Sequence, residues 1–317
     1  MKTEEYLLKE QVDVDITKIK LPKLSDIEVN MIEEYVELTR HVQEIDQLFH
    51  IFKVNLQQLL LHYELITNDT IIKKDNFAIE ENDGIIINAL VINYISSART
   101  FIESIETFIK KRLGIEAYEN YKKMYLSKLY DEKFTYRFLY SLRNFSQHGH
   151  LPVYIDYNNR CSFNLEEILN TPHFDHNAKL KEEMEEIREH IIKKFKDNPR
   201  IIFTRTIAEY QIIVLEIYES FIQYILDKLI FYYNEINQFV EINPEIRYKS
   251  KDVFNGYIMY EIKEDNLHCF NPDDNPVEMV KNIYDKLLIE LSDLKKEFDD
   301  IFKMKIIKES KYRNNKK

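Results

Sequence analysis

The 317-residue sequence contains only four glycines, seven prolines and two cysteines, and it has no tryptophan. So few glycines and prolines argue against a β-sandwich or an α/β fold, because both need many tight turns. Neither a glycine-rich phosphate loop nor a dinucleotide-binding fingerprint is present, which excludes nucleotide-dependent enzymes of those familiar kinds. Cys161 and Cys269 show no metal-ligand spacing. We expect no metal and no cofactor.

Positive charge is also scarce, because 44 Lys and Arg stand against 55 Asp and Glu and leave a net charge of −11. This balance argues against sequence-independent coating of nucleic acid, but it is compatible with a local basic cleft. No uninterrupted apolar run approaches the roughly 18 residues of a membrane span. The charged N-terminus carries no apolar signal core. We therefore expect a soluble, cytoplasmic protein with no membrane partner.

Apolar residues make up 44% of the chain, which is enough for a sizeable core. Apolar spacing with the helical period predicts helices at residues 26–66, 84–112, 115–129, 134–148, 176–195, 200–241 and 277–307. Residues 153–163 and 257–271 alternate with period two, which predicts β-hairpins that could share one small sheet. The predicted fold class is therefore mainly α, an up-and-down bundle of long helices with one or two small β-hairpins.

The chain is expected to have three regions. Residues 1–24 form an N-terminal arm, and residues 25–240 form the helical domain, which includes a β-hairpin near 152–164. Residues 241–317 hold a β segment, a long helix and a basic tail.

Two of the predicted helices have open roles. Helix 84–112 mixes small and amide residues into its apolar face, which favours close helix packing or a polar pocket lined by Asn93 and Arg99. Helix 200–241 is the most apolar in the chain, which suits either a central core helix or a dimer helix.

The helix predicted at residues 134–148 gathers the side chains that could carry chemistry. At about 100° per residue, its apolar residues fill one side and its polar residues the other. The polar side carries Tyr136, Arg137, Tyr140, Arg143, Asn144, Gln147 and His148. Gly149 is expected to end the helix, and Pro152 prevents its resumption.

These residue types match the needs of RNA cleavage by its own 2′-hydroxyl, a reaction that requires no metal. An arginine offers a bidentate, permanently charged fork for the phosphate, and an imidazole carries protons near neutral pH. Asn144 can orient the imidazole, and Tyr136 or Tyr140 can stack on an unpaired base.

The run Arg143-Asn144-Phe145-Ser146-Gln147-His148 resembles the motif of the HEPN superfamily of helical ribonucleases. That motif is an arginine followed four to six residues later by a histidine, often with a polar residue directly after the arginine. His150 also fits, at a gap of six, but Asn144 and His148 share a helix face, which favours His148. The resemblance covers the helices between residues 25 and 240 and leaves the hairpins and the C-terminal helix unmatched.

The resemblance implies a metal-independent endoribonuclease that cleaves single-stranded or loop RNA to 2′,3′-cyclic phosphate ends. Arg143 would hold the phosphate, His148 would act as general base or acid, and Asn144 would complete the catalytic set. The residues expected to bind RNA are Arg99, Tyr136, Arg137, Tyr140, Gln147 and His150. The resemblance also implies a homodimer with both motifs facing one cleft. Such proteins commonly act as toxins or antiviral-defence effectors, a role compatible with an antitoxin or regulatory partner.

Two other interpretations compete with this one. An arginine with a histidine five residues later is often a surface ion pair plus a cation that stabilises a helix C-terminus. A non-catalytic, dimeric binding or scaffold protein would account for the acidic net charge and for helix 200–241. Pairing of Arg143 with a carboxylate on open surface would favour these alternatives.

Overall fold

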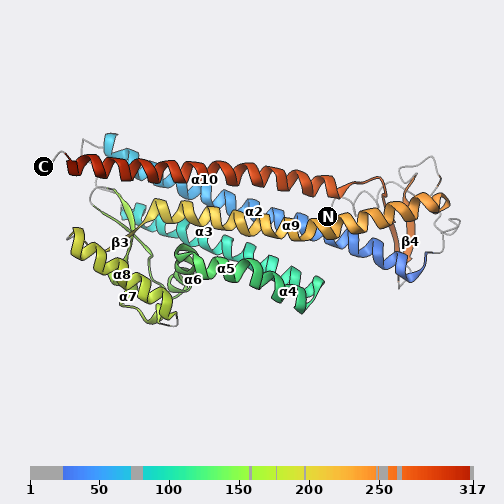
Figure 1. The fold of residues 1–317 in the computed structure, drawn as a ribbon, viewed down its shortest axis with the longest axis horizontal. Helices are drawn as coiled ribbons and strands as arrows, with labels where there is room; N and C mark the ends of the chain where they lie inside the picture. Colours follow the sequence, from blue (N-terminus) through green and yellow to red (C-terminus); the bar gives the residue numbers. More distant parts are fainter. Residues whose placement is uncertain are drawn as a thin grey trace. The chain divides into compact units, whose positions relative to one another are not determined.

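A computed structural model describes residues 24–72, 81–156, 159–175, 177–195, 198–247, 249, 256–262 and 266–314. It has 82% of its residues in helices and 6% in strands, which confirms the predicted mainly α fold with small β elements (Figure 1). The predicted N-terminal arm, apart from Leu24, and the last three residues of the basic tail lie outside the described residues.

Four long helices dominate the fold. They are α2 (Asp26–Ile72), α3 (Glu81–Phe108), α9 (Phe203–Ile242) and α10 (Pro276–Asn314). Shorter helical elements are η2 (Ile109–Leu113), α4 (Ile115–Tyr121), η3 (Lys122–Leu126), α5 (Ser127–Glu132), α6 (Phe134–Gln147), α7 (Leu165–Leu169), η4 (Pro172–Phe174), α8 (Ala178–Phe195) and η5 (Pro244–Ile246). The strands are β1 (Val153–Ile155), β2 (Cys161–Asn164), β3 (Arg200–Ile202), β4 (Ile258–Ile262) and β5 (Asn266–Phe270).

Most predicted helix ends follow local signals. Ser25 and Glu28 form a capping box at the start of α2, where each side chain accepts a hydrogen bond from the other residue's backbone N–H, at 2.6 and 3.4 Å. Gly114, with φ of 94°, ends the helical run that begins with α3. The helix predicted at residues 115–129 is interrupted by the π-helical turn η3.

The chain divides into two compact units. Of the described residues, one unit combines 24–39 with those between 227 and 279, and the other combines those between 40 and 226 with 280–314. The second unit contains α6 and therefore the whole Arg143–His148 motif.

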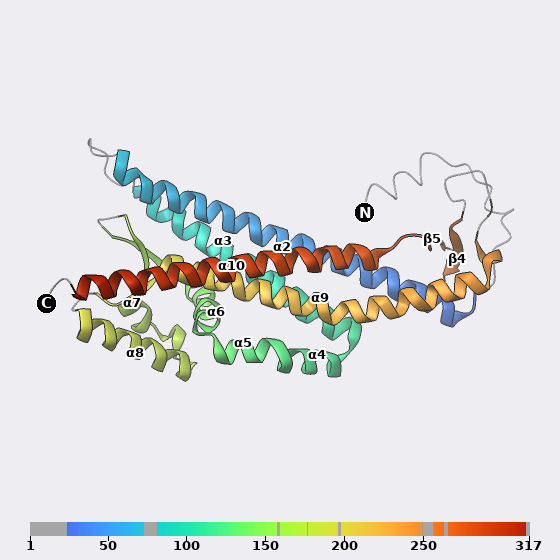
Figure 2. The same cartoon turned by 45° about the horizontal axis from the view of Figure 1, so that its top comes forward.

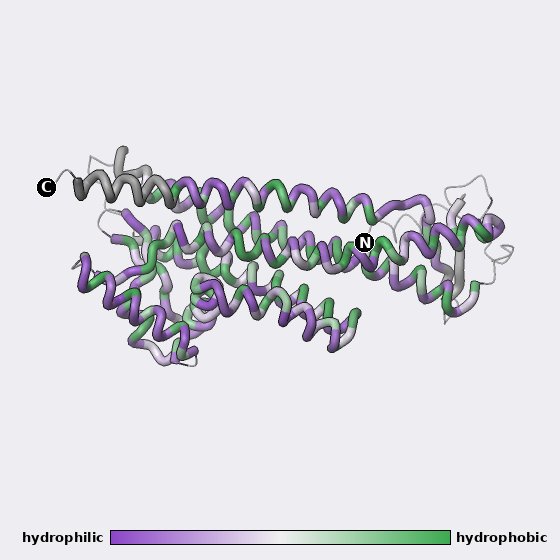
Figure 3. The backbone as a smooth tube through the Cα atoms, in the orientation of Figure 1, coloured by the Kyte–Doolittle hydropathy of each residue, from purple (hydrophilic) through white to green (hydrophobic). Residues whose placement is uncertain are grey.

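Aromatic side chains form the core of the second unit. Phe52 of α2 stacks on Tyr94 of α3 at 5.2 Å, and Phe49 lies 5.5 Å from Phe101. These pairings make α2 and α3 antiparallel neighbours (Figure 2). Tyr218 of α9 packs 4.6 Å from Phe49 and completes a three-helix contact. Hydrophobic and hydrophilic segments alternate along the long helices, as expected of helices with one buried face (Figure 3).

The apolar helix α9 is a core helix over this unit. Ile207, Tyr210, Val214, Ile217 and Phe221 are at most 2% exposed. The structure therefore confirms the first of the two roles open to this segment, and these side chains are not available for a dimer contact.

The first predicted hairpin is present, and it gains a third strand. β1 and β2 pair with Val153 opposite Phe163, and Asn159 adopts the left-handed conformation that the turn requires, with φ of 58°. Arg200, predicted to begin a helix, lies instead in β3, where it pairs with Asn164 of β2. β4 and β5 form a separate two-stranded sheet, so the two hairpins do not share one sheet.

Ring contacts and an exposed ion pair are found within the other unit. Tyr35 lies 6.5 Å from Tyr233 and 6.1 Å from Phe270. Arg247 donates to both carboxylate oxygens of Asp273, at 2.9 and 3.1 Å.

One helical stretch of the described residues, Asp83–Leu113, is long and apolar enough to cross a membrane by length and composition. The core helix of a soluble protein meets the same criterion, and 44% of the most apolar window is buried within the protein.

Candidate active site

Helix α6 is amphipathic, as predicted, and its apolar side anchors it. Phe138, Leu139, Leu142 and Phe145 are fully buried. The helix ends at its predicted position, because Gly149 has a positive φ of 87°, which glycine adopts without strain. This anchoring fixes where the polar residues at the end of α6 lie.

The motif residues occupy the last turn of α6 and its C-cap. Arg143 and Asn144 are half-buried, whereas Gln147 and His148 are exposed. His148 is the C-cap residue, and its backbone N–H donates to the carbonyl of Phe145 at 3.3 Å. An exposed imidazole at a helix end can reach a substrate.

The guanidinium of Arg143 makes no hydrogen bond and no ion pair with any described residue. Its Nε is buried and has no hydrogen-bond partner there. The predicted sign of a structural role, a carboxylate paired with Arg143, is therefore not present among the described residues. Leaving a buried donor without a partner costs free energy.

His150 differs from His148 in its surroundings. Its ring stacks on Phe145, with centroids 4.5 Å apart and planes 18° apart, and its side chain is half-buried. His150 is thus held against the apolar side of α6, while His148 is exposed at the helix end.

Arg99 of α3 reaches the polar side of α6. Its guanidinium carbon lies 3.9 Å from the ring centroid of Tyr140, and its Nε donates to Glu103 at 2.6 Å. Tyr140 is three residues before Arg143 and four before Asn144, so the three share one helix face. The structure therefore brings Arg99 and Tyr140 to the motif, as the hypothesis requires.

Arg137 is placed differently, since its side chain is only 2% exposed. It donates to both carboxylate oxygens of Glu183 on α8, at 2.5 and 2.6 Å. It also donates to the carbonyls of Tyr130 and Asp131 at the end of α5, the latter at 2.8 Å. In this position Arg137 joins three helices, and we leave it out of the RNA-binding set.

Tyr136 is also enclosed, at 5% exposure. Its ring contacts those of Tyr130 and Tyr210, and burial raises the pKa of its phenol well above the ordinary value. Among the described residues, α5, α8 and α9 cover the N-terminal half of the polar side of α6, and its exposed residues lie in the C-terminal half.

Asn88 of α3 supports the segment that follows the motif, a role that was not predicted from the sequence. Its Oδ1 accepts from the backbone N–H of Val153 at 2.8 Å, and its Nδ2 donates to the Val153 carbonyl at 2.9 Å. The amide thus holds the first residue of β1, five positions after His148. The sequence does contain one indication of this role, because Asn88 places a polar amide on the buried side of an apolar helix.

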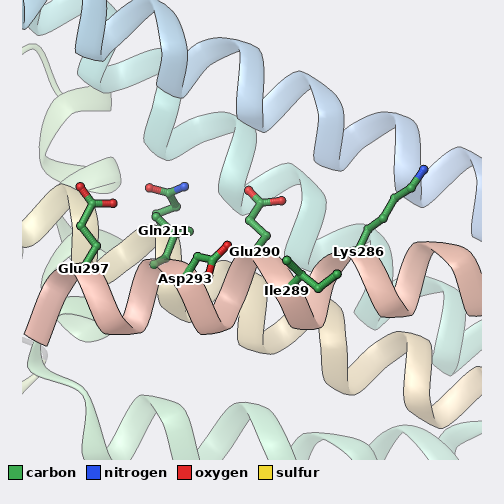
Figure 4. Close-up of a pocket in the computed structure, with 7 residues that line it drawn as sticks. Gln211, Lys286, Ile289, Glu290, Asp293 and Glu297 are labelled. Atoms are coloured by element: carbon green, nitrogen blue, oxygen red, sulfur yellow. The ribbon is translucent and has the colours of Figure 1, made fainter.

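Two hollows in the described surface lie away from the motif. One, of about 390 Å³, lies between α9 and α10, where Gln211 meets the carboxylates of Glu290, Asp293 and Glu297 (Figure 4). Lys286 also lines it, but the three carboxylates leave an excess of negative charge that disfavours phosphate. The other lies between α2 and α3 and has a volume of about 610 Å³. No group of three or more His, Cys, Asp or Glu residues in the described part of the chain could hold a metal ion.

No family model, no curated protein and no solved structure matches this chain. The geometry of α6 and its neighbours is thus the basis for any functional proposal.

Proposed function

We propose that this protein is a metal-independent endoribonuclease of the HEPN type, which cleaves single-stranded or loop RNA. One observation carries the proposal: α6 presents an arginine with no hydrogen-bond or ion-pair partner among the described residues, and an exposed histidine at the same end. Both belong to the Arg143-Asn144-x3-His148 motif, and Arg99 and Tyr140 lie beside it.

The proposed reaction is attack of the RNA 2′-oxygen on the adjacent phosphorus. The P–O bond to the 5′-oxygen breaks, which leaves a 2′,3′-cyclic phosphate and a new 5′-hydroxyl. Arg143 stabilises the charge that develops on the non-bridging oxygens. His148 takes the 2′-hydroxyl proton or gives a proton to the 5′-oxygen, and water or a second copy's His148 performs the other transfer.

The remaining residues position the substrate in this proposal. Asn144 orients the imidazole of His148, and the ring of Tyr140 with the Arg99 guanidinium on it forms a stacking surface for an unpaired base. Gln147 is exposed beside the motif and can bind a base edge or a phosphate. We assign the proton carrier to His148 over His150, because the His150 ring is stacked on Phe145.

The test is cleavage of total tRNA and of a mixed-sequence single strand in EDTA, followed by analysis of the new 3′ ends. Wild type is compared with Arg143→Ala, His148→Ala and the matched control His150→Ala. We expect cyclic phosphate ends from wild type and His150→Ala, and loss of cleavage in the other two. Equal cleavage by all four proteins would indicate a contaminating nuclease and contradict the proposal.

The biological proposal is a toxin or antiviral effector, restrained by an antitoxin or regulatory partner. Overproduction of the wild type should arrest growth and cut host RNA, and His148→Ala should do neither. Normal growth with uncut RNA, together with no cleavage in vitro, would favour the alternative of a non-catalytic dimeric scaffold. That alternative cannot use residues 207–221 of α9 as its interface through the five apolar side chains named above, because they are buried.

A further inference from the structure

The outward face of α2 and α3 carries almost no charge, in a chain that is 31% charged. Residues 47–65 of α2 contain two charged residues, the exposed Glu64 and Lys53, whose ammonium is paired with Glu290 at 2.8 Å. Residues 84–98 of α3 contain none. Exposed helix surfaces normally carry charges, and their depletion is typical of the centre of a protein interface.

We call the exposed residues on the outward sides of these two neighbouring helices the uncharged face. On α2 it comprises Gln47, Ile51, Val54, Gln58, Leu61 and Leu65. On α3 it comprises Ile85, Ile86, Ala89, Asn93 and Thr100. Because the two helices are antiparallel neighbours, the C-terminal end of the α2 stripe lies beside the N-terminal end of the α3 stripe.

The size of this surface matches a stable interface. Its six large apolar side chains are 41–66% exposed. Together they amount to on the order of 500 Å² of apolar surface, the size of the largest apolar patch on a typical monomer, which is often a functional surface. A standard interface buries about 800 Å² per partner, of which a little over half is apolar.

We propose that the uncharged face is the docking surface for a second copy of this chain. Two molecules that each carry a net charge of −11 repel each other, and an uncharged face lets them approach without bringing like charges together. An apolar, uncharged surface is also complementary to itself, as a two-fold symmetric interface requires.

The pattern on α2 supports a helix partner. Ile51, Val54, Gln58, Leu61 and Leu65 are spaced by three and four residues in turn, which is the spacing of a coiled-coil seam. A single polar residue in such a seam, here Gln58, fixes the register of the two helices.

The hollow of about 610 Å³ continues this face toward the other end of α2 and α3. Glu44 and Glu103 line it together with Lys111 and Arg112. Charges of both signs at the edge of an uncharged centre correspond to the polar rim of a protein interface. A membrane is the less favoured occupant, because Gln58, Asn93 and Thr100 lie within the face.

The test is the mass of the full chain by sedimentation velocity, from nanomolar to high micromolar concentration. We compare wild type with Leu61→Glu on the uncharged face and with the matched control Ile192→Glu on α8. Leu61 and Ile192 are both exposed, at 62% and 47%. Thermal melting checks that each variant folds.

We expect a wild-type dimer, a dimer dissociation constant raised at least 30-fold by Leu61→Glu, and no change with Ile192→Glu. Association restored by mixing Leu61→Glu with Leu61→Lys would further support self-docking. A wild type that is monomeric at every concentration would overturn the inference. So would vesicle binding by a monomeric wild type that Leu61→Glu abolishes, since the face would then bind lipid. RNA cleavage is a separate readout, so the ribonuclease proposal and this one can fail independently.

Discussion

Two arginines on α6, six residues apart, have opposite surroundings. Two nitrogens of Arg137 are engaged by Glu183 and by the carbonyls at the end of α5, and its side chain is 2% exposed. Arg143 is half-buried and makes no hydrogen bond within the described part of the chain. The first arginine holds helices together, whereas the second has no anionic partner among the residues that the structure describes, as the proposed phosphate-binding role requires.

The two arginines should respond differently to substitution. Removal of a side chain that stabilises the fold lowers the free energy of unfolding, whereas removal of a side chain that binds only the substrate lowers activity alone. Substitutions at four positions distinguish these outcomes.

The largest expected effect is on catalysis. Arg143→Ala should reduce RNA cleavage by about 10³-fold, on the order of 4 kcal/mol, because the charge developing on the phosphate loses its cation. Its free energy of unfolding should stay within about 0.5 kcal/mol of wild type, since its guanidinium makes no hydrogen bond or ion pair with a described residue that could be lost. Cleavage assays and chemical denaturation measure the two quantities. A variant that loses stability and activity in parallel would contradict the distinction between the two arginines.

The next effect is on stability. Glu183→Ala should lower the free energy of unfolding by about 3 kcal/mol, because the buried guanidinium of Arg137 is left without its counter-charge. The control is Glu182→Ala, one residue earlier on α8 and exposed, which should change it by less than about 0.5 kcal/mol. Denaturant titration distinguishes them. Equal effects of the two substitutions would show that the Arg137 ion pair does not stabilise the fold.

A neutral polar group should have an intermediate effect. Asn88→Ala removes both hydrogen bonds to Val153 and should cost about 2 kcal/mol. The control is Asn93→Ala, which removes an exposed amide on the same helix and should leave the stability unchanged. It is measured in dilute solution, because Asn93 belongs to the uncharged face. Cleavage activity should also fall in Asn88→Ala, because β1 follows directly on the segment that carries His148. Unchanged stability in Asn88→Ala would show that water replaces the amide.

The smallest effect on stability is expected for the exposed ion pair between Arg247 and Asp273. Arg247 lowers the pKa of the Asp273 carboxyl, whose side chain is 71% exposed, so solvent screens the pair. Asp273→Asn should cost no more than about 0.5 kcal/mol at neutral pH. The pair stabilises the fold fully above the ordinary pKa of an aspartate and loses this contribution as the pH falls through the lowered value. Wild type and variant should therefore converge in acid, and denaturation curves at several pH values measure this.

The local signals in the sequence were sufficient to predict α6 and its end. Apolar spacing with the helical period defined its buried side, and Gly149 with Pro152 defined where it stops. The turn of the first hairpin was predictable for a similar reason, because asparagine tolerates the positive φ that Asn159 adopts.

These local signals do not predict contacts between residues that are far apart in the sequence. The burial of Arg137 depends on Glu183, which is 46 positions away in the sequence, so α6 alone predicts an exposed arginine there. Residues 200–202 continue the apolar pattern of α9, and only pairing with β2 makes them a strand. Asn88 belonged to an apolar run whose partner, Val153, lies 65 residues away. In each case tertiary contacts outweighed the local pattern.

The amide of Asn88 also changes what the small sheet can do. β1 is an edge strand, since the strand order is β1-β2-β3. An open edge offers unpaired N–H and C=O groups that another chain's strand can join, which starts aggregation. Asn88 occupies both groups of Val153 and so closes part of this edge from the side of α3. Asn88, which positions the segment after the motif, thereby also limits pairing of the β1 edge with strands of other molecules when the protein is concentrated.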